Sequence, residues 1–138
     1  MNSEEILSLI KYRLEQAQTA LEDGKFLLEG ARSPQSIVNR AYYAMFYAAL
    51  ALLQQIRKVP SKHAGVISLF DTEFVVRGIF PKELSKDFHK VFELRQMFDY
   101  RVLEPASAAK AQEVLQKAVR FVEAVRNYLL ESGCSDEG

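Results

Sequence analysis

The sequence has few of the residues that build disulfide frameworks or metal centres. Its 138 residues include one cysteine, Cys134, and two histidines, His63 and His89. One thiol closes no internal disulfide and supplies no cysteine-based zinc site, so a transition metal would need carboxylate ligands as well. The pattern Glu-x-x-His of helical di-iron proteins is absent too. We therefore expect no metal and no cofactor.

Common catalytic motifs are missing as well. The sequence contains no glycine-rich phosphate loop and no His-Glu-x-x-His. No trio of serine, histidine and acid stands out at a recognisable spacing. These absences argue against an ordinary metalloenzyme or hydrolase.

Excess charge and long apolar runs are also lacking. The 18 Lys and Arg residues balance 18 Asp and Glu residues. This balance argues against a global basic field for coating DNA or RNA, although it is compatible with a local basic patch. The longest uncharged apolar run, 41–53, is too short for a bilayer, which needs about 20 residues. Residues 1–5 are acidic and lack the basic start of a signal peptide, so we expect a cytoplasmic protein that does not enter membranes.

The length and composition are those of one globular domain. The chain is 49% hydrophobic and 26% charged, both ordinary for a folded domain. A chain of this length buries roughly two-thirds of its unfolded surface, enough for a core without disulfides. We expect a single domain over residues 1–131 and a flexible tail over residues 132–138.

Apolar residues recur at helical spacing nearly throughout the chain. Proline, glycine and serine mark the breaks between the predicted helices: Gly30, Ser33-Pro34, Val59-Pro60-Ser61, Gly78, Pro81 and Pro105. These breaks leave a short helix over 62–76 among four long ones, and the second long helix extends from Pro34 to about Arg57. No stretch alternates with the period of a strand. The sequence predicts an all-α protein, an up-and-down helical bundle of four long helices plus one short helix.

The middle of the second helix, 41–53, is apolar on all faces. A helix without a polar face is covered on most sides. In a chain of this size it is either the central helix of the bundle or part of a subunit interface.

Arg95 lies within or beside the apolar stripe of the fourth predicted helix. A guanidinium with an apolar flank needs a carboxylate, a phosphate or a partner across an interface. Asp99 follows four residues later on the same face, and Tyr100 comes next, so these three residues are catalytic candidates. The simpler interpretation is a structural pair of Arg95 and Asp99 at the helix end.

Two further groups are candidates for nucleotide or RNA binding. Arg40, Tyr43 and Tyr47 share one helix face, which can stack on and hydrogen-bond a base. Aromatic residues at this spacing also commonly belong to the core. Lys62 and His63 stand at a predicted helix start, where free N–H groups favour anions, unless this segment is a solvated turn.

Four segments together resemble the HEPN superfamily, in particular its small stand-alone members. Residues 36–47 are similar to the family's helix Ser-x-x-x-x-Ala-Tyr-Tyr-Ala-Met-Phe-Tyr. Residues 62–66 resemble its His-Lys-Gly-type turn. Residues 78–81 and 94–100 resemble its later signature, which ends in Asp-Tyr. The resemblance extends over residues 3–130.

This resemblance implies an up-and-down helical bundle that is usually a homodimer. It also implies a frequent partner, a minimal nucleotidyltransferase, often within a two-gene toxin–antitoxin module. Active HEPN members are metal-independent RNases that use an arginine followed after four to six residues by a histidine, with the two sites meeting across the dimer. Arg95 aligns with that arginine.

The sequence departs from the family pattern at the histidine. After four to six intervening residues, Arg95 is followed by Tyr100, Arg101 or Val102. A tyrosine or an aspartate with an ordinary pKa is a poor substitute for proton transfer near pH 7. The missing histidine makes catalysis doubtful and favours binding.

Three functions are open at this point. The first is a HEPN-type protein that binds RNA, a nucleotide or a nucleotidyltransferase partner through a cleft near Arg95. The second is a metal-independent RNase toxin, in which Arg95 stabilises the scissile phosphate and Asp99, Tyr100 or His63 transfers protons. The third is a structural adaptor that dimerises through its apolar second helix.

Overall fold

A computed structural model describes residues 1–100 and 107–133, with the side chains of residues 99 and 100 left undescribed. It contains α1 (Ser3–Glu29), α2 (Pro34–Gln55), α3 (His63–Phe70), the π-helix η1 (Asp71–Val75), α4 (Lys82–Tyr100) and α5 (Ala108–Glu131). No strand occurs in these described ranges. The predicted all-α fold is confirmed.

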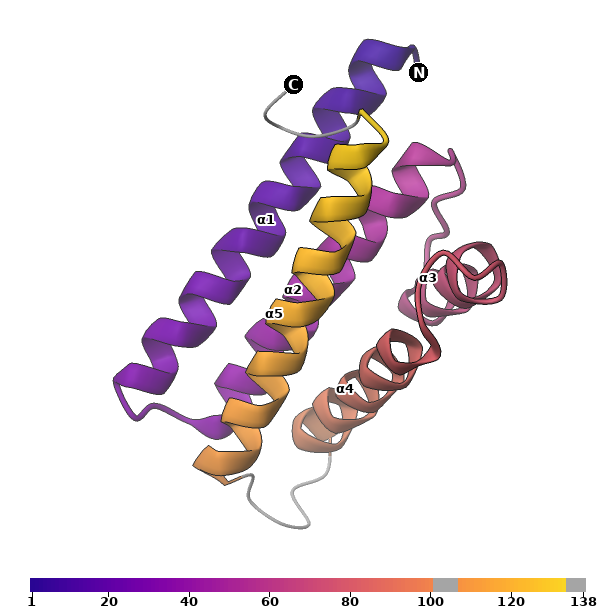
Figure 1. Cartoon of the computed structure of the whole chain (residues 1–138). Helices are drawn as coiled ribbons and strands as arrows, with labels where there is room; N and C mark the ends of the chain where they lie inside the picture. Colours follow the sequence, from indigo (N-terminus) through magenta and orange to yellow (C-terminus); the bar gives the residue numbers. More distant parts are fainter. Residues whose placement is uncertain (101–106, 134–138) are drawn as a thin grey trace.

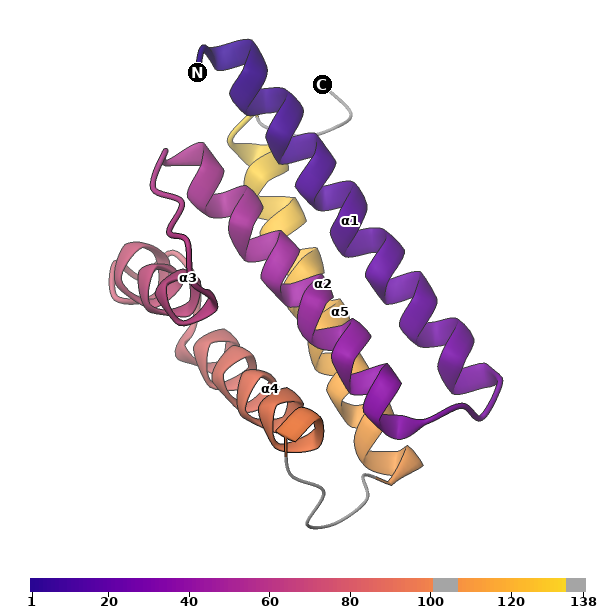
Figure 2. The same ribbon diagram turned by 180° about the vertical axis from the view of Figure 1, so that it is seen from behind.

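The long helices form a bundle around α2. Helices α1, α2 and α5 run side by side, and α4 packs against α2 and α5 (Figures 1 and 2). The short α3 crosses the bundle and contacts α2 and α4. This arrangement brings one end of α3 and one face of α4 onto the same side of α2.

Local chemistry sets the ends of the helices. Asn2 accepts a hydrogen bond from the Glu5 backbone, and the Glu5 carboxylate accepts one from the Asn2 backbone, which completes a capping box on α1. Ser33 caps α2 ahead of Pro34, as predicted. Helix α2 ends at Gln55, slightly before the predicted end, because Arg57 takes a left-handed conformation with φ of 60°.

The predicted short helix over 62–76 is interrupted. Its first part is α3, and its second part widens into η1, where the Val76 N–H donates to the Asp71 carbonyl at 2.8 Å. This five-residue step is the hydrogen-bond pattern of a π-helix. At the other end of the chain, Ser132 caps α5, and residues 134–138 of the predicted tail lie outside the described residues.

The apolar run 41–53 is the centre of the core. Every residue of this run is buried except Tyr43 and Tyr47, which are partly exposed. Helix α2 contacts α1, α3, α4 and α5, all from its own chain. Of the two interpretations that the sequence left open, the structure supports the central helix, so the run is not left over as a subunit interface.

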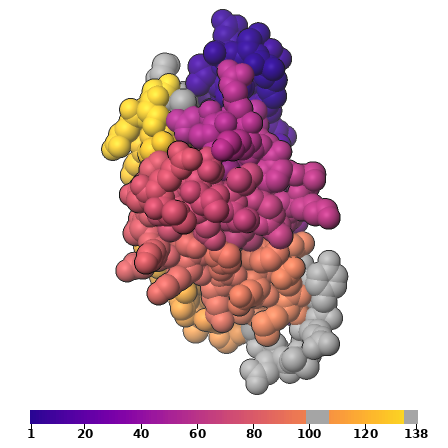
Figure 3. Space-filling view, turned by 90° about the vertical axis from the view of Figure 1, so that its right-hand side faces the viewer, coloured from indigo at the N-terminus to yellow at the C-terminus, as the bar shows by residue number. Residues whose placement is uncertain are grey.

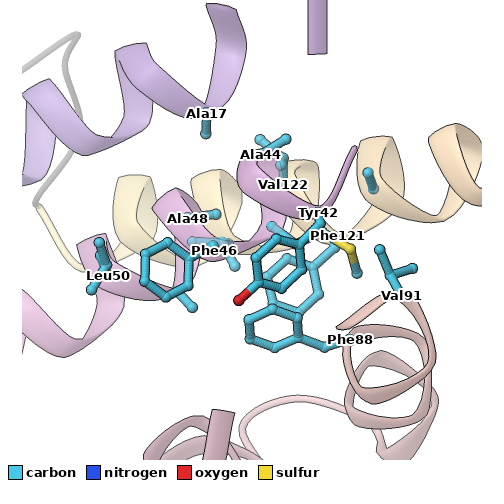
Figure 4. Packing of buried hydrophobic residues seen from close by; sticks show 14 of the residues in the cluster. Ala17, Tyr42, Ala44, Phe46, Ala48, Leu50, Phe88, Val91, Phe121 and Val122 are labelled. Atoms are coloured by element: carbon cyan, nitrogen blue, oxygen red, sulfur yellow. The ribbon is translucent and has the colours of Figure 1, made fainter. Parts of the chain in front are cut away.

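The two sides of α2 pack differently. Figure 4 shows Ala44 and Ala48 facing α1, where small side chains permit a close approach, and Tyr42 facing α4. On the α4 side, Phe88 is fully buried. Its ring centroid lies 4.9 Å from that of Phe121 on α5, so aromatic packing joins α4 to the rest of the bundle.

Replacing Phe88 by alanine should therefore lower the free energy of unfolding by about 3–5 kcal/mol, since a buried ring is lost and a cavity remains. Urea denaturation followed by circular dichroism measures the change. Phe26→Ala is the matched control, because Phe26 is 75% exposed and its removal should cost little. Equal effects of the two substitutions would contradict the packing described for α4.

Candidate functional site

Arg95 reaches from α4 onto two tyrosine rings of α2. Its guanidinium carbon lies 5.2 Å from the ring centroid of Tyr42 and 5.4 Å from that of Tyr43. The side chain is partly buried, as its place beside the apolar stripe predicted. The negative face of a tyrosine ring attracts a guanidinium, so both rings hold this charge at a defined place.

A second arginine contacts the same tyrosine. The guanidinium carbon of Arg40 lies 5.3 Å from the Tyr43 ring centroid. Its Nε and Nη2 atoms donate to Asn39 Oδ1 at 3.2 and 2.8 Å. Tyr43 is therefore bordered by one guanidinium from α2 and one from α4. The two arginines form a local basic site in a chain without net charge.

The predicted face of Arg40, Tyr43 and Tyr47 is present on α2. Both tyrosines pack on the core with one side and are partly exposed on the other. Arg40 and Tyr47 line a cavity of about 290 Å³ against α1, and Arg40 and Phe98 line another of about 400 Å³ between α2 and α4. The face is a margin of the core that opens into hollows, and its role in binding a nucleotide or RNA stays a prediction.

His63 begins α3 and joins this site from the other side. Its Nδ1 atom lies 2.9 Å from the Tyr42 hydroxyl, a hydrogen bond whose direction depends on the imidazole tautomer. Its ring stacks on Phe46 at 4.2 Å between centroids. These contacts leave Nε2 as the nitrogen that can meet a ligand.

A glycine permits this placement of His63. A Cβ atom at Gly65 would lie 3.0 Å from Pro60 Cβ, which is tighter than ordinary contact. Glycine therefore lets α3 begin directly against the Pro60 turn. The sequence Lys-His-Ala-Gly thus holds the His63 ring against α2.

Burial and Arg95 together keep the His63 ring neutral. Burial is the larger cause that lowers the pKa of His63, and the Arg95 charge lowers it further. Burial also raises the pKa of Tyr42 far above its ordinary range, although Arg95 opposes this shift. At neutral pH the cluster is therefore a positive guanidinium beside an uncharged imidazole and an uncharged phenol.

The remaining candidates lie at the margins. Lys62 is exposed, next to His63, and makes no side-chain cap on α3. Asp99 and Tyr100 belong to α4, but their side chains lie outside the described residues, as do Arg101 and Val102. The pairing of Arg95 with Asp99 and the catalytic roles of Asp99 and Tyr100 stay predictions.

The structure also brings together three residues that were not among the candidates from the sequence. Ser85 Oγ donates to Asp71 Oδ1 at 2.7 Å, and His89 Nε2 lies 2.6 Å from Asp71 Oδ2. The serine bonds the carboxylate rather than the imidazole, so no base activates it and this is no catalytic triad. The only signal in the sequence was that Ser85 and His89 are one helical turn apart.

The described residues hold neither a cluster of metal ligands nor a membrane-spanning helix. They contain no group of three or more His, Cys, Asp and Glu side chains placed to hold a metal ion. No helix among them has the length and apolar character needed to cross a membrane.

Comparisons with known proteins agree with this architecture. The family model described as "HEPN domain" matches residues 10–128. A UPF0332 protein of Thermotoga maritima is 37% identical to the chain and covers 94% of it, with 96% of its own length aligned. The chain therefore belongs to the HEPN domain family.

Other similar proteins carry functional names. A protein of Methanocaldococcus jannaschii named "Putative toxin MJ0605" is 35% identical over 93% of this chain and 91% of its own. A chain in a solved structure titled "Crystal structure of the toxin-antitoxin with AMP-PNP" aligns with a TM-score of 0.53. It covers 91% of this chain and 99% of its own at 17% identity, which shows a shared fold.

The electrostatics of the site predict how His63 titrates. Its pKa should lie below the ordinary value of about 6.5. Arg95→Gln should raise it only in part, because burial is the larger cause. Since the unfolded chain binds this proton more readily, the contribution of His63 to stability should be complete above about pH 6.5 and decrease as the pH falls.

Imidazole signals in NMR spectra across the pH range measure this titration. Arg120→Gln removes an exposed arginine of α5 and should leave the His63 pKa unchanged. A His63 pKa at or above the ordinary value would contradict the described environment.

Proposed function

We propose that this HEPN-domain protein binds the phosphate groups of RNA or a nucleotide at the two arginines that border Tyr43. The observation that carries the proposal is the convergence of Arg40 and Arg95 on one ring, at 5.3 and 5.4 Å. Guanidinium groups suit phosphate oxygens because they donate several N–H bonds in a fixed fork. Tyrosine rings serve as stacking surfaces for unpaired bases.

The distribution of charge supports a local rather than a general nucleic-acid surface. The chain has no net charge, so long-range attraction of a polyanion is weak. The affinity then depends on the few phosphates that reach Arg40, Arg95 and the neighbouring Lys62. Such binding favours single-stranded segments or nucleotides over duplex DNA.

The relatives suggest the biological setting. One is named "Putative toxin MJ0605", and the solved structure with a similar fold is titled "Crystal structure of the toxin-antitoxin with AMP-PNP". We infer that this chain also works beside a partner in a toxin–antitoxin-like pair, and that the partner is a minimal nucleotidyltransferase. We further infer that the chain forms a homodimer, as the family resemblance implies.

Replacing Arg95 by alanine should weaken binding of a short single-stranded RNA about 10- to 100-fold, the loss expected for one hydrogen-bonded charge. The affinity of Arg95→Lys should lie between those of the unaltered protein and Arg95→Ala, because lysine keeps the positive charge but lacks the forked N–H donors of the guanidinium. Fluorescence anisotropy at a stated salt concentration measures the dissociation constants, and thermal melting shows that the variants are folded.

Arg120→Ala is the control for removing one positive charge, because Arg120 is an exposed arginine of α5. It should change the affinity less than twofold. If folded Arg95→Ala binds as well as the unaltered protein, the proposed site is wrong.

A second candidate function, metal-independent RNA cleavage, is favoured by His63. The sequence has no histidine at the expected spacing after Arg95, but the fold places His63 where the charge of Arg95 shifts its pKa. A neutral imidazole can take the proton of a ribose 2′-hydroxyl while the guanidinium stabilises the phosphate. His63 would then replace the missing histidine from another helix.

If the protein cleaves RNA, His63→Gln should lower the rate about 10²- to 10⁴-fold, the range for loss of a general acid or base. The assay contains EDTA and compares initial rates of a labelled RNA. Arg120→Gln should cleave at the unaltered rate. Cleavage at the unaltered rate by His63→Gln would remove His63 from the mechanism while leaving phosphate binding at Arg95 open.

A further inference from the structure

A cavity of about 200 Å³ lies between α3 and α4, outside the contacts described for Arg95 and His63. It is lined by Ala64, Ile67, Ser68, Asp71, His89 and Phe92. Figure 3 shows the surface that α3, η1 and α4 form together on this side of the molecule. Pockets for drug-sized ligands measure roughly 300–1,000 Å³, so this one suits a single small ring system.

The cavity lies beside the arginine site. Ala64 directly follows His63 in α3. The Phe92 ring centroid lies 5.7 Å from that of Tyr42, and the Arg95 guanidinium carbon lies 5.2 Å from the same Tyr42 ring. Phe92 and Arg95 are three residues apart in α4, about 4.5 Å along the helix axis, so an anionic group at Arg95 and a ring at Phe92 lie about one helical turn apart.

The lining selects against a second phosphate and for a flat ring. Ile67 and Phe92 provide apolar surface, and Phe92 is a partly exposed aromatic ring. The Asp71 carboxylate would repel a phosphate, but it accepts hydrogen bonds from N–H groups on the edge of a base. Aromatic surface beside a hydrogen-bonding edge is the usual environment of an unstacked base.

The Asp71 carboxylate is held in place and can accept further hydrogen bonds. Ser85 and His89 each occupy one of its carboxylate oxygens, at 2.7 and 2.6 Å. A carboxylate offers about four lone-pair sites, so two sites are not used by these bonds. The Asp71 side chain is 27% exposed, which lets a ligand reach it.

The hydrogen-bonding pattern distinguishes the bases. Guanine presents two adjacent donors, N1–H and N2–H, which match the two oxygens of a carboxylate. Adenine and cytosine offer an amino group beside an acceptor nitrogen. Uracil offers one N–H between two carbonyl oxygens, which a carboxylate repels.

We propose that this cavity is a base subsite with a preference for guanine, and that Asp71 reads the guanine edge. This inference rests on the proposed function, because it requires the phosphate of the same nucleotide at Arg95. Phe92 provides the apolar contact for the ring. Ser85 and His89 position the carboxylate through their hydrogen bonds to it.

Binding of the four 5′-ribonucleoside monophosphates to the full chain tests the proposal. Isothermal titration should give GMP an affinity about tenfold above that of CMP and UMP, the effect of one additional hydrogen bond to a charged group. Asp71→Asn should abolish this preference and leave the affinity for ribose 5-phosphate, which has no base, unchanged. Glu83→Gln removes an exposed carboxylate of α4 and should retain the preference.

A second variant separates loss of the base contact from a disturbance of η1 by Asp71→Asn. Ser68→Leu fills the cavity from an exposed position of α3 without altering the bonds of Asp71, and it should also remove the guanine preference. Equal affinity of the unaltered protein for all four nucleotides would overturn the inference. So would a guanine preference that survives in both Asp71→Asn and Ser68→Leu.

The two proposals fail in different ways. Binding of ribose 5-phosphate reports on the arginine site alone. Arg95→Ala should weaken the binding of ribose 5-phosphate and of every nucleotide. If ribose 5-phosphate binds through Arg95 but no base is preferred, only the base subsite is wrong. If neither ribose 5-phosphate nor any nucleotide responds to Arg95→Ala, the proposed function is wrong and the subsite fails with it.

Discussion

The buried ring of Tyr42 joins the core of this protein to its candidate site. It is fully buried and contacts the rings of Phe46 and Phe88 on the core side. At its other edge, its hydroxyl bonds His63, and the guanidinium of Arg95 lies over its face. Helices α2, α3 and α4 therefore share one anchoring residue. A buried phenol requires a polar partner, so the need to satisfy its hydroxyl also holds the start of α3 in place.

The fold could be predicted because its signals are local. The caps at Asn2 and Ser33 and the apolar stripes depend on residues within a few positions of one another. The interruption of the third helix could not be predicted in this way. Nothing in the composition of 62–76 indicates a π-turn, and the burial of Phe70 and Phe74 does not require one, because residues four apart already share a face of a regular helix.

The site could be predicted only in part. Arg95 stood out because a charged residue within an apolar stripe can be recognised from the sequence of a single helix. His63 was also a candidate, but its place beside Arg95 could not be predicted because it comes from a different helix, and Tyr42 was one tyrosine within an apolar run. The family pattern directed attention to the positions after Arg95, whereas the imidazole near it comes from an earlier segment. The relation of Asp71 to His89 depends on η1 and had no counterpart in the sequence.

The π-helix has a consequence for how this segment can change in evolution. In an α-helix, residues three apart lie about 60° apart around the axis, because each turn takes 3.6 residues. The wider turn of η1 separates Asp71, which faces Ser85, from Phe74, which packs in the core beside Phe70. Deleting Thr72 or Glu73 would leave the carboxylate and the phenyl ring two residues apart, about 200° around a regular helix, so the two side chains could not both keep their present neighbours. The wider turn thus acts as a phase shift that lets one short segment belong to both the core and the surface.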